Sequence, residues 1–254
     1  RGADDDRDRL DLWAYDIARR EHRRLIDSRA LLPPGATLSA EEAARRERQR
    51  TSAYSGILEY DFAPDSRRIL VPLGGDLYVY DLAAPPSAAV RRLTQTPGYE
   101  TDSRFSPQGR YVSFVRDQNL YAIELADGRE IAVTHGGGGT TSFGVAEFIA
   151  QEEMNRDTGY WWSPDETRLA YARVDESGVP ETERFEINAR SVEVVRQRYP
   201  FTGQANALVE LYVAPLASLD KPVRVDLGPT TDIYLARVDF FPDGNLLAVQ
   251  RQSR

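Results

Sequence analysis

Cysteine is absent from this sequence, and other residue types that often carry chemistry are scarce. The 254 residues include one lysine (Lys221), one methionine and two histidines. Without thiols the chain can form neither a disulfide nor a thiolate metal site, and two histidines alone are a weak basis for a zinc site. We therefore predict no metal and no cofactor. Lack of cysteine is compatible with both the cytosol and the periplasm.

Positive charge is also in short supply, because 32 Lys and Arg residues face 40 Asp and Glu residues for a net charge of −8. An acidic chain without a basic stripe is a poor partner for nucleic acid or for an anionic membrane surface. No apolar run approaches the roughly 18 residues of a membrane-spanning helix. The remaining composition, 41% hydrophobic and 28% charged, is typical of a globular protein with a sizeable core.

A catalytic nucleophile is missing too, since the sequence contains no G-x-S-x-G motif of the kind that carries the serine of α/β-hydrolases. His22 falls in a predicted turn and His135 lies beside a glycine run, so neither is placed for a catalytic triad. We therefore predict that the chain contains no catalytic residue and has no acyl-transfer activity by itself.

What the sequence does contain is a repeated turn motif. An aromatic residue is followed two positions later by proline, then by Asp or Gln, and then by an apolar run. Proline followed by an acidic or amide residue is turn chemistry, so each copy predicts a strand, a tight turn and a second strand. The four copies are Phe62-Ala63-Pro64-Asp65, Phe105-Ser106-Pro107-Gln108, Trp162-Ser163-Pro164-Asp165 and Phe240-Phe241-Pro242-Asp243.

A second pattern, alternating in the manner of a half-buried strand, recurs in phase with the first. Its copies begin at Leu12, Leu77, Leu120 and Leu211. Phe62 and Phe105 are 43 residues apart, as are Leu77 and Leu120, which is the period of a four-stranded propeller blade. The alternative, a β-sandwich with coincidental turns, does not explain two motifs that recur in phase.

The fold class we predict is therefore all-β, a β-propeller of about four blade-equivalents spanning residues 1–254. The other spacings between turn motifs, 57 and 78 residues, exceed the blade period and indicate insertions. An open propeller leaves strand edges and an apolar face uncovered, so we expect the chain to be part of a longer protein.

Two insertions with short helices are predicted. In residues 27–50, Ser39 is a plausible N-cap, and the segment from Glu41 to Arg50 has acids first and arginines last, as the helix dipole favours. A solvated helix with pairs such as Glu42 with Arg46 accounts for most of these arginines.

The second insertion, residues 136–157, contains the run Gly136 to Gly139 and then a short helix predicted over Val145 to Asn155. The glycine run lacks the lysine of a phosphate loop. Glu152 and Glu153 lie near the helix end, where acids oppose the dipole, so they are not placed for helix stability. Together they could accept the three N–H donors of an ammonium group.

The segment Gln151-Glu152-Glu153-Met154-Asn155-Arg156-Asp157-Thr158-Gly159-Tyr160-Trp161-Trp162-Ser163-Pro164 resembles the double-glutamate motif of dipeptidyl peptidase IV and its relatives. Three further segments carry the resemblance over essentially the whole chain, most closely to bacterial members. They are Leu12 to Ile17, Ala40 to Arg50 running into Gly56 to Tyr60, and Leu73 to Tyr78.

The resemblance implies an eight-bladed propeller followed by a C-terminal α/β-hydrolase domain with a Ser-Asp-His triad, a domain absent from this chain. The implied enzyme is a serine exopeptidase that removes Xaa-Pro or Xaa-Ala dipeptides from free N-termini. Glu152 and Glu153 would then bind the N-terminal amine of the peptide substrate. An arginine, Arg50 or less closely Arg48, would orient the substrate carbonyl. The resemblance also implies a homodimer and a periplasmic or secreted location.

Three alternatives remain open from the sequence. The first is a non-catalytic relative that works by binding partners. The second is an acylaminoacyl or prolyl endopeptidase of the same architecture, which needs no site for a free amine. The third is a propeller scaffold with no enzyme attached.

Overall fold

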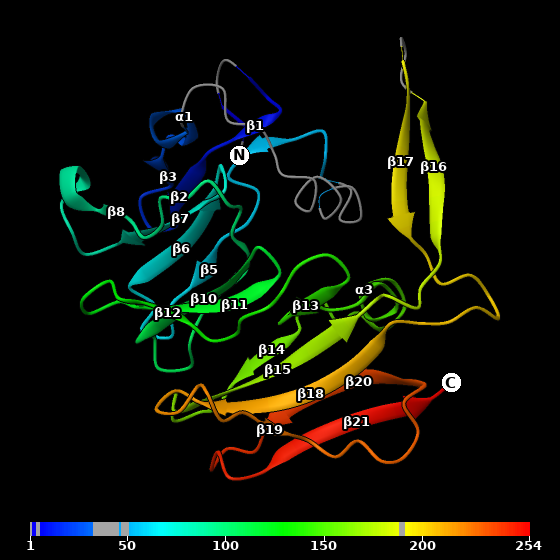
Figure 1. Cartoon of the computed structure of the whole chain (residues 1–254). Coiled ribbons are helices and arrows are strands. Elements are labelled where there is room, and N and C mark those ends of the chain that lie inside the picture. The colour runs from blue at the N-terminus through cyan, green and yellow to red at the C-terminus, as the bar shows by residue number, and fades with distance from the viewer. Residues whose placement is uncertain (1, 4–5, 33–45, 47–50, 188–190) are drawn as a thin grey trace. The chain divides into compact units, whose positions relative to one another are not determined.

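Short antiparallel β-sheets are the predominant secondary structure of the chain (Figure 1). The structure, a computed structural model, describes residues 2–3, 6–32, 46, 51–187 and 191–254. The chain divides into two compact units, residues 1–117 with 121–131 and residues 118–120 with 132–254. Among the described residues, no helix has the length and apolar character needed to cross a membrane.

The first unit begins with short elements around a hairpin. Strand β1 pairs in parallel with β4, and β2 pairs with β3 in antiparallel register. The bounds are β1 (Arg9–Leu10), β2 (Leu12–Asp16), β3 (Glu21–Ile26), α1 (Ser28–Leu31) and β4 (Ser55–Gly56).

The turn between β2 and β3 contains no glycine. Arg20 adopts a φ of 60°, and the Asp16 carboxylate accepts a hydrogen bond from the N–H of Arg19 at 2.9 Å. His22 consequently lies on β3, edge-on to the ring of Tyr15. Its predicted place in a turn is wrong, because the turn uses a residue type that gives no turn signal.

Two four-stranded antiparallel sheets follow, each in chain order, which is the arrangement of a propeller blade. The first contains β5 (Asp61–Phe62), β6 (Arg68–Leu73), β7 (Asp76–Asp81) and β8 (Val90–Arg92), with the 3₁₀ helix η1 (Pro86–Ala88) before its last strand. The second contains β9 (Thr101–Phe105), β10 (Tyr111–Arg116), β11 (Asn119–Glu124) and β12 (Glu130–Ala132).

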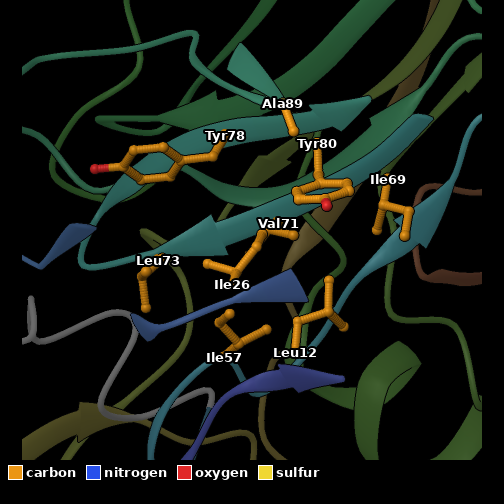
Figure 2. Packing of buried hydrophobic residues seen from close by; sticks show 9 residues of the cluster. All are labelled: Leu12, Ile26, Ile57, Ile69, Val71, Leu73, Tyr78, Tyr80 and Ala89. Atoms are coloured by element: carbon orange, nitrogen blue, oxygen red, sulfur yellow. The ribbon is translucent and has the colours of Figure 1, made fainter. Parts of the chain in front are cut away.

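Sheet β5–β8 buries both of its faces. On one face Ile69, Val71 and Tyr80 pack with Leu12 and Ile26 of the β2–β3 hairpin (Figure 2). The alternate residues of the same strands point the other way and pack with Phe105, Val112, Phe114 and Ile123 of the next sheet. Face-to-face packing of successive sheets is how propeller blades bury their apolar surface.

The second unit holds a larger sheet, in which β15 pairs with β18 along one edge and with both β13 and β14 along the other. Strand β19 completes it, and β20 and β21 form a separate antiparallel pair. The bounds are β13 (Thr141–Phe143), β14 (Tyr160–Trp162), β15 (Arg168–Asp175), β18 (Leu208–Pro215), β19 (Val223–Arg224), β20 (Ile233–Phe240) and β21 (Leu247–Ser253).

The four aromatic-proline motifs form the same turn between paired strands. Two residues after each proline the backbone has a positive φ, at Ser66 (57°), Gly109 (73°), Glu166 (58°) and Gly244 (71°). The N–H of that residue donates to the carbonyl three positions earlier at 2.8–2.9 Å in every copy. The sequence repeats are therefore structural repeats, and the predicted all-β fold is confirmed.

The 78-residue spacing is explained by a hairpin that leaves the larger sheet of the second unit between β15 and β18 (Figure 1). Strands β16 (Glu181–Ile187) and β17 (Val192–Arg198) pair only with each other among the described strands. The sequence indicated an insertion here and did not identify its structure.

Candidate functional site

The segment with the double glutamate leaves the second unit's larger sheet in the middle of an edge strand. Strands β13 and β14 lie on the same edge of β15, where Phe143 is opposite Arg173 and Tyr160 is opposite Tyr171. Ala172 of β15, which lies between Tyr171 and Arg173, hydrogen-bonds to both ends of the segment that connects β13 to β14, called the excursion below. It accepts a hydrogen bond from the N–H of Gly144 at 2.9 Å and donates one to the carbonyl of Gly159 at 2.7 Å.

The two ends of the excursion, residues 144 to 159, also touch each other. A Cβ added at Gly159 would lie 2.3 Å from the carbonyl oxygen of Val145 and 2.5 Å from the carbonyl carbon of Gly144. Real Cβ atoms do not approach backbone so closely, so position 159 requires glycine for this close contact. The excursion is thereby closed at its base.

Helix α3 (Phe148–Met154) stands within this excursion and is shorter at both ends than the predicted span from Val145 to Asn155. It ends at Asn155, which adopts the left-handed conformation (φ 50°, ψ 43°) that asparagine tolerates better than most residues. The N–H groups of Asn155 and Arg156 both donate to the carbonyl of Ala150. Two capping bonds to one carbonyl stop the helix directly after the double glutamate.

A helix of seven residues is too short to be stable by itself, so tertiary contacts must hold α3 in place. Ala150 is completely buried, and the ring of Phe148 packs edge-on against Tyr199 with centroids 5.1 Å apart. The Gln151 side-chain amide donates to the carbonyl of Ala146 at 2.5 Å.

A buried ion pair connects the two ends of the helix. Glu147 precedes α3, Arg156 follows it, and the carboxylate Oε2 of Glu147 pairs with the guanidinium Nη2 of Arg156. The side chains are only 6% and 3% exposed. This pair could not be predicted from the sequence, because residues nine apart with a helix between them give no periodic signal.

Glu152 and Glu153 are both exposed on the last turn of α3. In the part of the chain that the structure describes, no basic side chain forms an ion pair with either carboxylate. Two adjacent exposed carboxylates on a helix that is fixed at both ends are well suited to bind a small cation with several N–H donors.

The arginines predicted to assist them, Arg48 and Arg50, lie outside the described residues, as does the helix predicted from Ser39. Arg46 is described in the first unit, where its side chain is buried and donates to the hydroxyl of Tyr99 at 3.3 Å. Among the described residues there is no group of three or more side chains that could hold a metal ion.

Comparisons with known proteins confirm the family that the sequence resembles. The family described as "Dipeptidyl peptidase IV (DPP IV) N-terminal region" matches residues 63–254. A probable dipeptidyl peptidase 4 of Aspergillus flavus is 30% identical over 179 residues, 66% of this chain and 22% of that protein. Dipeptidyl peptidase 8 of Mus musculus is 27% identical over 243 residues, 81% of this chain and 27% of that protein.

Solved structures show the same fold. The crystal structure of Porphyromonas gingivalis dipeptidyl peptidase 4 superposes with a TM-score of 0.72 at 24% identity, covering 98% of this chain and 34% of that one. A structure of a putative dipeptidyl aminopeptidase IV from Bacteroides ovatus gives a TM-score of 0.60 at 22% identity, with 96% and 31% covered. The chain thus spans about a fifth to a third of the length of these similar proteins.

Proposed function

The chain belongs to the dipeptidyl peptidase IV family, and from this premise we propose that it is the amine-binding propeller portion of a serine exopeptidase that releases N-terminal dipeptides. In this proposal Glu152 and Glu153 bind the free N-terminal ammonium group of a peptide. The peptide bond that follows the second residue is then the one presented for cleavage. The catalytic serine, its base and the oxyanion hole come from a hydrolase domain outside these residues.

One observation carries this proposal: two adjacent carboxylates stand exposed, with no ion pair to any described residue, at the end of a helix whose ends are joined by a buried ion pair. An ammonium group has three N–H donors, and two carboxylates offer enough oxygens to accept all of them. Holding the amine at a fixed point sets the register of the chain, which is how a binding residue contributes to rate without touching the reacting atoms.

Arg50, or Arg48 beside it, is proposed to orient the substrate carbonyl. Because a guanidinium presents several N–H donors in one plane, it can hold a peptide carbonyl while the carboxylates hold the amine. Replacing each arginine singly by Lys in the full-length enzyme distinguishes the two: the one that contacts substrate should show the larger rise in KM.

The proposal is tested by hydrolysis of a Gly-Pro chromogenic amide by the full-length protein. The variant Glu152→Gln/Glu153→Gln keeps the shape of both side chains and removes their charge. Loss of one partner of a desolvated charge pair costs about 2–5 kcal/mol, so kcat/KM should fall by about thirtyfold to several thousandfold. Asp220→Asn, at an exposed position on the same unit, is the matched control and should leave kcat/KM unchanged.

Other outcomes would favour the alternatives. Equal activity of the parent and the double variant, together with cleavage of N-acetylated substrates, would indicate an endopeptidase that does not need the glutamates. A full-length protein that releases nothing from any such amide would indicate a binding protein.

A homodimer is part of the same proposal, with the β16–β17 hairpin as its contact. Phe185, Ile187, Val192 and Val194 are 52–81% exposed, and the register places Phe185 opposite Val194 and Ile187 opposite Val192 on one face. Their exposure is unusual for large apolar residues that lie side by side.

The next pair on that face, Glu183 and Arg196, forms an ion pair at 3.2 Å. A face with an apolar stripe and one charge of each sign is complementary to a copy of itself related by a two-fold axis. Phe185→Glu should therefore convert the full-length protein from dimer to monomer in sedimentation, whereas Glu193→Gln, which the register places on the opposite face, should not. An unchanged mass for Phe185→Glu would exclude the hairpin as the contact.

A further inference from the structure

A contribution to overall stability does not by itself explain the buried ion pair between Glu147 and Arg156. Taking both charges out of water costs several kcal/mol per ion, and replacing such pairs by apolar residues is often neutral or stabilising. Both side chains are nevertheless almost entirely buried, at 6% and 3% exposure. The position of the pair relative to α3 suggests what else it does.

Every nitrogen of the Arg156 guanidinium is used. Nη2 pairs with Oε2 of Glu147, Nη1 donates to the carbonyl of Thr158 at 2.8 Å, and Nε donates to the carbonyl of Leu235 at 2.9 Å. These partners lie before α3, after α3 and on strand β20. One planar side chain therefore holds the start of the helix, the segment that follows it and a neighbouring strand together.

The helix between these anchors carries the double glutamate. Glu147 is the N-cap residue of α3, and its carbonyl accepts a hydrogen bond from the N–H of Gln151. After the helix, the N–H of Arg156 donates to the carbonyl of Ala150. The side-chain pair thus closes a ring around a helix too short to be stable alone. Any loosening of the ring moves the last turn, where Glu152 and Glu153 lie.

We propose that Arg156, held by Glu147, is a positioning residue that sets the place and orientation of the Glu152 and Glu153 carboxylates for binding the substrate amine. This inference depends on the proposed function. The pair is electrically neutral, so it leaves the negative charge of the two exposed glutamates uncompensated and available to a cation. A lysine at position 156 would keep the charge and reach one of the three partners at a time, so it should hold the helix only partly.

The experiment compares two substrates that differ only in the amine, the chromogenic amides of Gly-Pro and of acetyl-Pro. The ratio of their kcat/KM values measures amine recognition. It is determined for the full-length enzyme per titrated active serine, so that unfolded protein does not count. The variants are Arg156→Gln, Arg156→Lys and Glu147→Gln.

We expect the ratio to fall about tenfold or more in Arg156→Gln and in Glu147→Gln, and to be intermediate in Arg156→Lys. Hydrolysis of the acetyl-Pro amide per active site should stay within a factor of about two. If Arg156→Gln yields no titratable serine, Glu147→Gln carries the same test, because it keeps the volume of the side chain and removes its charge.

Arg116→Lys is the matched control. Arg116 is a largely buried arginine of the first unit, with a side chain 11% exposed and paired with Glu100 and Glu130. The Arg116→Lys variant should lower the thermal stability and leave the ratio of the two kcat/KM values unchanged.

If kcat/KM falls equally for both substrates, so that their ratio stays constant, the inference is overturned and Arg156 is a merely structural residue. Two different results would refute the proposed function itself. In one, the parent enzyme shows no preference for the substrate with the free amine; in the other, Glu152→Gln/Glu153→Gln leaves the ratio unchanged. A ratio that falls in the double-glutamate variant and not in the Arg156 and Glu147 variants refutes the inference alone.

Discussion

Replacing Gly159 by alanine should disable the amine site without touching it. The added Cβ would lie 2.3 Å from the carbonyl oxygen and 2.4 Å from the carbonyl carbon of Val145, both of them backbone atoms that no side-chain rotation can move. Ordinary van der Waals contact begins at 3.4 Å, so the two segments that meet at the base of the excursion must separate by about 1 Å. Forced overpacking of this kind costs about 1–3 kcal/mol.

The larger effect should be on binding, because the displaced base supports α3. A misplacement of about 1 Å in a group that positions a substrate can cost about a hundredfold in rate. We therefore expect Gly159→Ala in the full-length enzyme to lose about a hundredfold in kcat/KM for a Gly-Pro amide. Amide hydrogens of residues 144–160 should also exchange faster, as measured by mass spectrometry.

Gly178→Ala is the control for this prediction. A Cβ at Gly178 meets only the Cβ of Ala205 at 3.9 Å, so the same substitution there is free of clashes. It should leave activity unchanged and stability equal or slightly higher. If Gly159→Ala retains kcat/KM within about threefold of the parent, with unaltered exchange, the base of the excursion does not determine the position of the double glutamate.

Three further predictions concern the repeated turns and the core. Ser66→Gly should raise the stability by up to about 1 kcal/mol in thermal unfolding, because Ser66 is an exposed non-glycine residue at a φ of 57°; a lower melting temperature would contradict this. Hydrogen bonds from the Ser163 side chain and from the Thr167 backbone and side chain lower the pKa of Asp165 to about 2. The stability from Asp165 is therefore present above its ordinary pKa of 3.8 and lost as the pH falls through about 2, so Asp165→Asn should flatten acid unfolding between pH 4 and 2. Leu70→Ala, at a fully buried position of β6, should cost about 2–5 kcal/mol in denaturant unfolding followed by a probe in the first unit, and a smaller loss would mean that the sheets around it repack.

The strands could be predicted from the sequence wherever a turn signal marks their start. Pro164 and Asp165 illustrate the reason: proline sets its own φ, and the Asp165 carboxylate accepts the N–H of Thr167 at 3.1 Å. This chemistry is local, so it is visible in four consecutive residues. The same logic failed for the β2–β3 turn, where Arg20 takes the positive φ that glycine usually supplies.

The β16–β17 hairpin escaped prediction for a related reason. No aromatic-proline motif directly precedes it. Its alternating residues include exposed apolar side chains such as Phe185 and Ile187, so the sequence pattern does not distinguish a buried face from an exposed one. Its length could be inferred only as an excess over the blade period.

The candidate site divides in the same way. Glu152 and Glu153 are adjacent, and the misfit between two acids and a helix C-terminus is readable from the sequence. The contacts that hold the two glutamates in place cannot be predicted from the sequence. Arg156 meets Leu235, 79 residues away. Gly159 meets Val145 only because Gly159 and Gly144 both hydrogen-bond to Ala172 of β15. Long-range pairing of this kind depends on how the sheet folds and leaves no periodic trace.

The most direct test of the proposed function is a crystal structure of the full-length protein with a dipeptide product bound. Our account predicts that the ammonium nitrogen of the dipeptide lies within about 3 Å of carboxylate oxygens of both Glu152 and Glu153. A dipeptide whose amine is held by other residues, with these two glutamates in solvent, would contradict it.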